Sequence, residues 1–271
     1  MSTQNMSIHR DRAARFQTEG WISSTAFLEA KELDALRSEA SGFFSPSKTG
    51  RRPDRVNDGF DVINNVWKTE SRFRSVAFHP TLTRNVAALL GVNHIVLLRD
   101  SVYVKPVTGS SELHWHQDYQ AAPADPPTNV VACWMALDDV DIENGAMQMA
   151  IGSPGLGRLV PTNLSSGRPK VSGMNDSTVP DPMELGLQVV TVALKAGEIS
   201  YHNALTLHRS GQNTSGRPRR AYVVRYASAD ALYARAPAAP PHIYAIEHAG
   251  HEMDYGKRIG DLGIFPVIEC S

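Results

Sequence analysis

From about residue 94 onward, the chain consists of short apolar or β-branched runs separated by turn-forming residues, without helical patterns between them. Runs of this kind occupy residues 95–104, 129–137, 146–151, 188–194, 198–202 and 220–227. Turn signals such as Glu143-Asn144-Gly145 and Ala196-Gly197 separate them. Because parallel α/β folds need a helix between successive strands, the pattern favours an antiparallel β-sandwich or jelly roll.

The first ninety residues have helical periodicity instead. Apolar residues recur at helical spacing between a serine that can cap a helix, at position 23 or 24, and Gly42. A second helix is predicted from His79-Pro80 to Gly91, since proline suits a first turn and glycine a helix end. Residues 45–63 are rich in polar residues and glycine and predict a long loop. Helices followed by many strands predict an α+β chain.

The chain length of 271 residues is enough for one sizeable core and favours a single domain over residues 1–271. We expect a mainly helical part (1–93) and a jelly-roll core (94–235), followed by a C-terminal extension (236–271). The core is interrupted at residues 155–187, which are rich in Gly, Pro, Ser and Asn. A loop of this length is usually a lid or binding loop, or disordered.

Composition and charge exclude several classes of function. The net charge of -1 gives no global field for nucleic acid, and the basic cluster Arg217, Arg219 and Arg220 lacks interleaved aromatic residues. No apolar stretch approaches 18 residues, so no membrane span is expected. Two cysteines, Cys133 and Cys270, are too few for a disulfide framework. With a polar N-terminus that lacks the apolar core of a signal peptide, this favours a cytoplasmic location.

The segment Trp115-His116-Gln117-Asp118 is the first candidate for chemistry. Alternate residues of a strand point to the same side, so His116 and Asp118 can reach one metal ion. A third ligand from a remote strand would complete a triad of two histidines and one carboxylate, which leaves open positions on Fe(II). By itself the pattern His-x-Asp is a common accident.

The second candidate is His208, at the end of a predicted strand, together with Arg219. Arg219 opens an apolar strand eleven residues later. An arginine at this position is explained if its planar guanidinium binds a carboxylate through two hydrogen bonds inside the barrel. The alternative is a charge at a strand edge beside Pro218, and for Arg219 taken alone that alternative is favoured.

Taken together, these features resemble the phytanoyl-CoA dioxygenase-like (PhyH) family of Fe(II)/2-oxoglutarate-dependent oxygenases. The resemblance extends from about residue 16 to about residue 233. It is carried by Phe16 to Trp21, Val104-Lys105-Pro106, Trp115 to Asp118, Glu143 to Ala146, Gly152-Ser153, His208 to Asn213, Arg219 and Tyr226 to Asp230. One departure is Pro154, where the family commonly has histidine.

The resemblance implies a fold, a cofactor set and a reaction. The fold is a double-stranded β-helix (a cupin-like jelly roll) with N-terminal helices packed on the major sheet. His116, Asp118 and His208 would hold Fe(II), and Arg219 would bind the distal carboxylate of 2-oxoglutarate. With dioxygen, the enzyme would oxidise, most often hydroxylate, a small organic substrate while 2-oxoglutarate becomes succinate and CO2. A carboxylate at Asp118 argues against halogenation, because related halogenases lack one there.

Further candidates for the cofactor pocket are Ser101, Tyr103 and Trp134. Ser101 and Tyr103 share one strand face with Arg99 and are expected to point into the barrel, where they can contact 2-oxoglutarate or substrate. Trp134 lies in the middle of a predicted strand. It is expected either to line the cofactor pocket or to pack in the core, and core packing is favoured. His202 is expected to be structural or to lie beside the metal ligands.

Several alternatives stay open. Desaturation, epoxidation or ring formation use the same cofactors and depend on how the substrate lies. A non-catalytic jelly-roll binding protein, or an iron dioxygenase that does not use 2-oxoglutarate, would leave Arg219 without a role. The family default is a hydrophobic or amphiphilic small-molecule substrate, whose identity the sequence does not give; nor does it give the oligomeric state. The histidines of residues 242–251 are assigned to a surface or lid segment.

Overall fold

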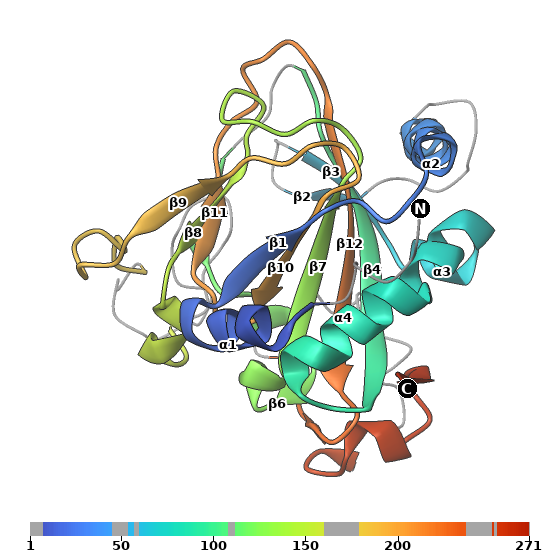
Figure 1. Ribbon diagram of the computed structural model, residues 1–271, viewed down its shortest axis with the longest axis vertical. Coiled ribbons are helices and arrows are strands. Elements are labelled where there is room, and N and C mark those ends of the chain that lie inside the picture. Colours follow the sequence, from blue (N-terminus) through green and yellow to red (C-terminus); the bar gives the residue numbers. More distant parts are fainter. Residues whose placement is uncertain are drawn as a thin grey trace.

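The computed structural model describes residues 8–44, 54–56, 60–107, 112–159, 179–236, 251 and 254–270. Two antiparallel sheets pack on each other, and four helices lie along the larger sheet (Figure 1). The predicted α+β jelly roll with N-terminal helices on the major sheet is therefore confirmed.

The larger sheet has eight strands, and all its strand pairs are antiparallel. Its order is β1 (Trp21–Ser24), β10 (Ile199–Asn203), β7 (Val130–Ala136), β12 (Arg219–Ser228), β4 (His94–Lys105), β3 (Phe60–Asn64) and β2 (Asp54–Val56), with β14 (Val267–Glu269) also on β4. The smaller sheet has the order β5 (Leu113–His116), β11 (His208–Ser210), β8 (Met147–Ala150) and β9 (Val189–Val192). A short pair is formed by β6 (Ala124–Asp125) and β13 (Leu232–Tyr233).

The helices cover the outer face of the larger sheet. They are α1 (Arg10–Glu19), α2 (Ala30–Phe43), α3 (Ser71–Ala77) and α4 (Pro80–Leu90). Their apolar faces share one buried core with the sheet, in which Phe73 of α3 packs edge-on against Tyr222 of β12. Short 3-10 turns are η2 (Val66–Lys68), η3 (Asp118–Ala121), η4 (Pro127–Asn129), η5 (Ser153–Leu156) and η7 (Ile259–Asp261).

Alternation along β12 separates this outer core from the interior of the jelly roll. Tyr222 and Val224 join the helices, whereas Ala221 and Val223 pack with residues of the smaller sheet. Because side chains alternate with a period of two, Arg219 and Arg225 lie on the same inward face as Val223. The interior between the two sheets is therefore where polar side chains of β12 can meet those of β5 and β11.

Two predicted features of the N-terminal part are wrong. Ser23 and Ser24 do not cap a helix but belong to β1, which pairs with β10, and α2 begins at Ala30 with Glu29 as its N-cap. The loop predicted over residues 45–63 contains β2 and β3. A strand near the sheet edge is held mainly by backbone hydrogen bonds, so its polar composition hid it. The helix predicted from His79-Pro80 is confirmed as α4, with Gly91 in the left-handed conformation at its end.

The segments on either side of the core contribute to the fold as well. From the predicted C-terminal extension, β14 pairs with β4 and Ile259 is buried beside them. His242, His248 and residues 160–178 lie outside the described residues. His251 contacts Asp254 at 2.8 Å. None of the helices in the described ranges combines the length and the apolar character that a membrane span requires.

Candidate metal centre

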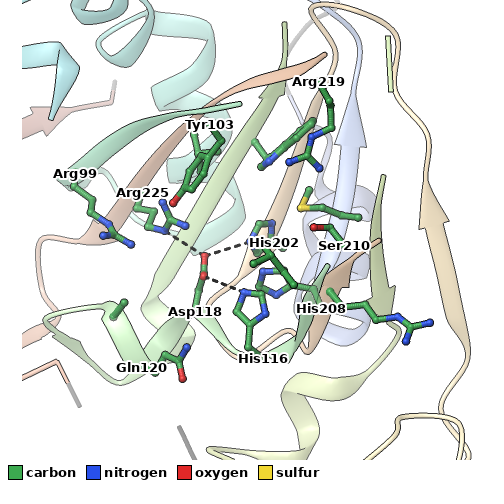
Figure 2. Close-up of a pocket in the computed structure, with 16 residues that line it drawn as sticks. Arg99, Tyr103, His116, Asp118, Gln120, His202, His208, Ser210, Arg219 and Arg225 are labelled. Atoms are coloured by element: carbon green, nitrogen blue, oxygen red, sulfur yellow. Dashed lines mark hydrogen bonds and ion pairs between the residues drawn. The ribbon is translucent and has the colours of Figure 1, made fainter. Parts of the chain in front are cut away.

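Two neighbouring strands of the smaller sheet bring His116 and His208 together. The strands β5 and β11 are antiparallel, and His116 and His208 are register partners whose ring centroids lie 4.1 Å apart. Asp118 follows as the first residue of η3, with Oδ1 4.0 Å from Nε2 of His116. One ligand atom from each of the three residues lies within 4.8 Å of the others (Figure 2).

The reason predicted for this proximity is only partly right. His116 and Asp118 were expected to be alternate residues of one strand, but β5 ends at His116 and Asp118 lies in a 3-10 turn. Gln117 between them holds the turn in place: its Nε2 donates to the carbonyls of Gly157 and Leu205, each at 2.8 Å, and its Oε1 accepts from Leu159 N–H at 2.8 Å. Hydrogen bonds between Gln117 and loop residues, and not strand alternation, therefore hold Asp118 beside His116.

Backbone carbonyls orient both imidazole rings. Nδ1 of His116 lies 2.7 Å from the carbonyl of His114, and Nδ1 of His208 lies 2.9 Å from the carbonyl of Thr206. Because a carbonyl only accepts, each Nδ1 carries the proton and each Nε2 keeps its lone pair. This is the usual arrangement of a metal-binding histidine, in which a second partner fixes tautomer and ring orientation.

The protonation states also suit a metal. Burial lowers the pKa of His208 well below its usual value, and His116 and His202 lower it further. Burial likewise lowers the pKa of His116. For Asp118, burial raises the pKa, but Arg225 and His202 outweigh it, so the pKa lies well below its usual range. Two neutral imidazoles and an ionised carboxylate form the donor set of a non-haem Fe(II) triad.

Two further side chains contact Asp118. Arg225 of β12 donates from Nε to Asp118 Oδ2 at 3.2 Å. The ring of His202, from β10, lies 4.6 Å from that of His208, and its Nε2 is 3.5 Å from Asp118 Oδ2. Within the described part of the chain, neither ring nitrogen of His202 has a hydrogen-bond partner. His202 thus lies beside the metal ligands, and Arg225 is a residue that the sequence reasoning missed.

A cavity extends from these residues between the two sheets, with an empty volume of about 740 Å³ that includes space open to solvent. Tyr103 and Trp134 line it, as does Gln120, which was not predicted. Ser101 does not line it, and its Oγ donates to Oδ1 of Asn64 at 2.7 Å.

Arg219 lines the same cavity but lies farther from Asp118 than Arg225 does (Figure 2). Its Nη1 donates to the carbonyl of Gly145 at 2.6 Å, and its Cζ lies 5.2 Å from the ring centroid of Trp134. Burial lowers its pKa to about 10, so the guanidinium is charged at neutral pH. Among the described residues no carboxylate forms an ion pair with Arg219, and its Nε has no hydrogen-bond partner, nor has the buried Oγ of Ser210.

These observations test whether 2-oxoglutarate fits. A buried cation without an anionic partner is costly, and removing one partner of a buried ion pair costs about 3–5 kcal/mol. An anionic ligand that reaches Arg219 and Ser210 would relieve this cost. The cavity therefore fits a small dicarboxylate next to a metal ion.

The turn at Gly145 explains how Arg219 is held. Gly145 has a φ of 84°, and a Cβ there would lie 2.6 Å from the carbonyl oxygen of Gly211. Asn144 closes the turn, because its side chain accepts from Asp141 N–H at 2.9 Å and donates to the Asp139 carbonyl at 2.7 Å. Only glycine brings the backbone this close to its neighbour, and the Gly145 carbonyl then meets Arg219.

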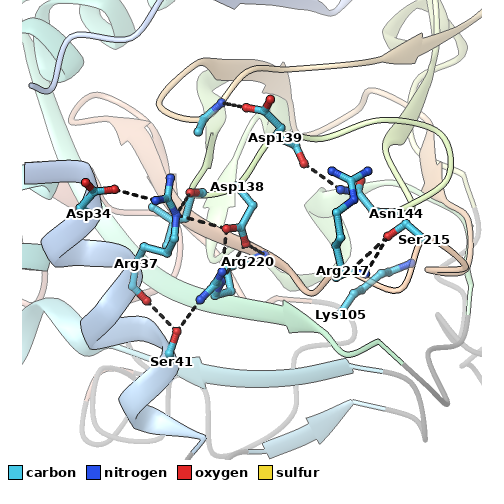
Figure 3. Close-up of polar contacts among 12 residues, drawn as sticks. Asp34, Arg37, Ser41, Lys105, Asp138, Asp139, Asn144, Ser215, Arg217 and Arg220 are labelled. Carbon is cyan, nitrogen blue, oxygen red and sulfur yellow. Dashed lines mark hydrogen bonds and ion pairs between the residues drawn. The ribbon is translucent and has the colours of Figure 1, made fainter. Parts of the chain in front are cut away.

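The basic cluster noted in the sequence does not act as a unit. Arg220 makes a bidentate pair with Asp138, with distances of 2.8 and 2.7 Å (Figure 3). Arg217 pairs with Asp141 at 2.7 Å. Arg219 between them points into the cavity instead. Strand alternation puts Arg219 and Arg220 on opposite faces of β12, and Arg217 lies before the strand begins.

Comparison with known proteins gives a consistent result. A sequence-family model described as "Phytanoyl-CoA dioxygenase (PhyH)" matches residues 16–221. The Bos taurus protein named "Phytanoyl-CoA dioxygenase domain-containing protein 1" is 28% identical over 152 residues, which are 55% of this chain and 50% of that protein. The chain therefore matches about half the length of that relative.

Solved structures of similar fold include two proteins from nogalamycin biosynthesis. One is the non-haem alpha ketoglutarate dependent epimerase SnoN, with a TM-score of 0.69 and 26% identity over 84% of this chain and 86% of that chain. The other is the non-haem alpha ketoglutarate dependent carbocyclase SnoK, with a TM-score of 0.73 and 20% identity over 99% of this chain and 98% of that chain. The second likeness, at lower identity, shows the fold alone.

Proposed function

The chain belongs to the phytanoyl-CoA dioxygenase family, and from that premise we propose that it is an Fe(II)/2-oxoglutarate-dependent oxygenase of a small organic substrate. The observation that carries the proposal is the buried cluster of His116, Asp118 and His208, beside a buried arginine without an acidic partner in the described chain. A binding protein of the same fold would need neither feature. The non-catalytic alternative is disfavoured for that reason.

His116, Asp118 and His208 are the proposed iron ligands. When bound, Fe(II) with 2-oxoglutarate and dioxygen supplies an oxidant for an unactivated carbon, and 2-oxoglutarate is released as succinate and CO2. The protein's own contribution is to fix the ligands and keep water out. The carbonyls behind His116 and His208 hold the rings, and Arg225 keeps Asp118 ionised.

Arg219 is the proposed partner of the distal carboxylate of 2-oxoglutarate, with Ser210 as an additional donor. A planar guanidinium can give two parallel hydrogen bonds to a carboxylate, which orients the ligand as well as binding it. Trp134 packs against Arg219 and limits where its guanidinium can lie. Tyr103 lines the cavity and is available to cosubstrate or substrate. Ser101 is not proposed as a ligand, since its hydroxyl is donated to Asn64.

Hydroxylation is the default outcome, with desaturation, epoxidation and ring formation as the second candidate. The likeness to SnoN, an epimerase that is 26% identical, supports keeping outcomes other than hydroxylation open. We propose a substrate with apolar surface, because Leu113, Met147 and Val223 line the cavity. A cytoplasmic location is proposed as well, supported by two cysteines that form no disulfide.

The experiment that tests the proposal is anaerobic calorimetric titration of 2-oxoglutarate into the Mn(II)-loaded protein and its Arg219→Ala variant. Loss of a buried charge-assisted pair costs about 2–5 kcal/mol, so affinity is expected to fall at least about 30-fold while metal affinity is kept. Arg217→Ala, two residues away and paired on the surface with Asp141, is the matched control. Equal affinity in both variants would remove Arg219 as the partner of 2-oxoglutarate, and a wild type that binds no 2-oxoglutarate would contradict the proposed function.

A further inference from the structure

The carbonyl that orients His208 belongs to the peptide group between Thr206 and Leu207. Nδ1 of His208 lies 2.9 Å from the Thr206 carbonyl, and the N–H of Leu207 donates to Oγ of Ser153 at 2.8 Å. A peptide group is planar, so a hydrogen bond at its nitrogen also fixes the direction of its oxygen. One rigid unit therefore connects the hydroxyl of Ser153 to the ring of His208.

Ser153 is itself held in place by β8. Its side chain is buried at the first position of η5, and its Oγ donates to the carbonyl of Ala150 at 2.7 Å. Because this bond uses the hydroxyl proton, the lone pairs of Oγ remain to accept from Leu207. The carbonyl of Leu207 in turn accepts from the N–H of Ala150 at 2.9 Å. The end of β8 and the turn after it thus hold Leu207 at both its N–H and its carbonyl.

Thr206 is held on its other side by the residue that ends α1. Its buried hydroxyl donates to the carbonyl of Gly20 at 2.6 Å. Gly20 has a φ of 87°, and a Cβ there would lie 2.6 Å from Oγ1 of Thr206 and equally 2.6 Å from Cγ of Pro154. A glycine at this position allows the backbone to approach both side chains. The N-terminal part of the chain is thereby packed against the residue whose carbonyl orients His208.

These contacts give a role to two sequence motifs that the iron ligands do not explain. Phe16 to Trp21 and Gly152-Ser153 both carry the family resemblance, and the N–H of Gly152 donates to the carbonyl of Glu19 at 3.0 Å. Both motifs meet at the peptide group behind His208. The ring of His116 is oriented differently, by the carbonyl of His114 within the same strand, β5.

We propose that Ser153 and Thr206 are positioning residues of the metal centre, which direct Nε2 of His208 toward the metal by fixing the peptide group between Thr206 and Leu207. The inference rests on the proposed function, because it takes His208 as a metal ligand. Loss of a residue that orients a metal-binding histidine typically lowers metal affinity by about 10- to 100-fold. The effect should be specific to His208, since the carbonyl behind His116 belongs to another strand.

The test compares Ser153→Ala and Thr206→Val with the wild type and with two controls. Thr206→Ser keeps the hydroxyl that donates to Gly20. Thr83→Val removes another buried threonine hydroxyl, which donates to the carbonyl of His79 at 3.3 Å on the far side of the larger sheet. Zn(II) affinity is measured by competition with a chromophoric chelator. Nitrogen NMR of labelled histidine in the Zn(II)-loaded protein reports the Nδ1–H signal of each ring separately.

Ser153→Ala and Thr206→Val are each expected to weaken Zn(II) binding by about tenfold or more. Thr206→Ser and Thr83→Val should stay within about twofold of the wild type. In the two weakened variants the Nδ1–H signal of His208 shifts or broadens, while that of His116 keeps its position. A general loss of stability would not produce this difference between the two rings.

Wild-type affinity and an unchanged His208 signal in either variant overturn the positioning role of that residue. An equal loss in Thr83→Val, or an equal shift of His116, overturns it for both residues. If Ser153→Ala does not fold, the comparison of Thr206→Val with Thr206→Ser decides. A wild type that binds no Zn(II) contradicts the metal centre and the proposed function with it, whereas tight binding that the variants retain contradicts the positioning role alone.

Discussion

Arg225 donates from Nε to Oδ2 of Asp118 at 3.2 Å and thereby connects the larger sheet to the carboxylate of the metal cluster. Arg219 lies on the same face of β12, with Ala221 and Val223 between the two arginines. One strand thus supplies the charge that keeps Asp118 ionised and the charge proposed to hold the cosubstrate. The two histidines come from the opposite sheet.

The contact between Arg225 and Asp118 has a consequence for pH. The pKa of Asp118 lies well below its usual range because Arg225 and His202 outweigh burial, so protons do not compete with the metal near neutral pH. In Arg225→Gln the pKa of Asp118 rises, and metal affinity is expected to begin falling at a higher pH as the solution is acidified. Zn(II) affinity measured from about pH 8 to about pH 5 tests this, with Arg225→Lys as the control that keeps the charge. Superimposable pH profiles for Arg225→Gln and wild type would contradict it.

Metal binding should stabilise the fold through the three ligands. A ligand that binds only the folded state adds about 2.7 kcal/mol at a concentration of 100 times its Kd. Mn(II) is therefore expected to raise the Tm of the wild type, and a chelator to lower it again. Asp118→Ala should lose most of this response. A variant in which Mn(II) still raises the Tm as in wild type would place the metal elsewhere.

The carboxyl group of Asp100 is expected to make the free energy of unfolding depend on pH independently of the metal. It is buried under the helices, where Oδ2 accepts from Trp67 N–H at 2.9 Å and from the Tyr222 hydroxyl at 2.6 Å. Burial raises its pKa from 3.8 to about 7, so the folded state holds this proton more tightly than the unfolded state. Stability from this group is full below the unfolded pKa and is lost as the pH rises toward the folded one.

The free energy of unfolding in urea, with a chelator present, is expected to fall by a few kcal/mol between about pH 4 and about pH 7 through this group. Asp100→Asn keeps an acceptor oxygen but has no proton to titrate, so its slope over the same range should be smaller. Equal slopes in the two proteins would show that Asp100 is ionised or not linked to folding.

Gln117 should matter for stability although it touches no metal. Gln117→Leu leaves the carbonyls of Gly157 and Leu205 and the N–H of Leu159 without this partner. The expected loss is about 2–4 kcal/mol in urea unfolding, together with weaker metal binding, because the turn that carries Asp118 loosens. Gln212→Leu, at an exposed position, is the control. An unchanged free energy of unfolding would mean that other contacts hold the turn.

Much of the fold followed from the sequence, and what was missed has physical reasons. The central strands β4, β7 and β12 are buried on both faces, so their apolar runs were visible. β2 and β3 lie at one end of the sheet order, where pairing depends on the backbone and leaves little trace in composition. Ser23 and Ser24 satisfied a capping pattern, but pairing with β10 decided their conformation.

The candidate site shows the same division. His116, Asp118 and His208 were singled out from spacing and family resemblance, and the structure brings them together. Arg225 was overlooked, although a period of two from Arg219 already put it on the inward face of an apolar strand. Arg99 shares the strand face that was expected to point into the barrel, and it lines the cavity. Gln120 was not singled out, although it lies in the same 3-10 turn as Asp118 and lines the cavity as well. Ser101 shared the predicted strand face but is used by Asn64.

The most direct test of the central claim is anaerobic addition of 2-oxoglutarate to the Fe(II)-loaded protein, followed by visible absorption. Simultaneous chelation of the metal by 2-oxoglutarate gives a weak metal-to-ligand charge-transfer band, which is expected in wild type and absent in Asp118→Ala. Admission of oxygen to the wild-type complex should then yield succinate. If no band forms in wild type although Fe(II) is bound, 2-oxoglutarate does not bind the metal and the assignment is contradicted.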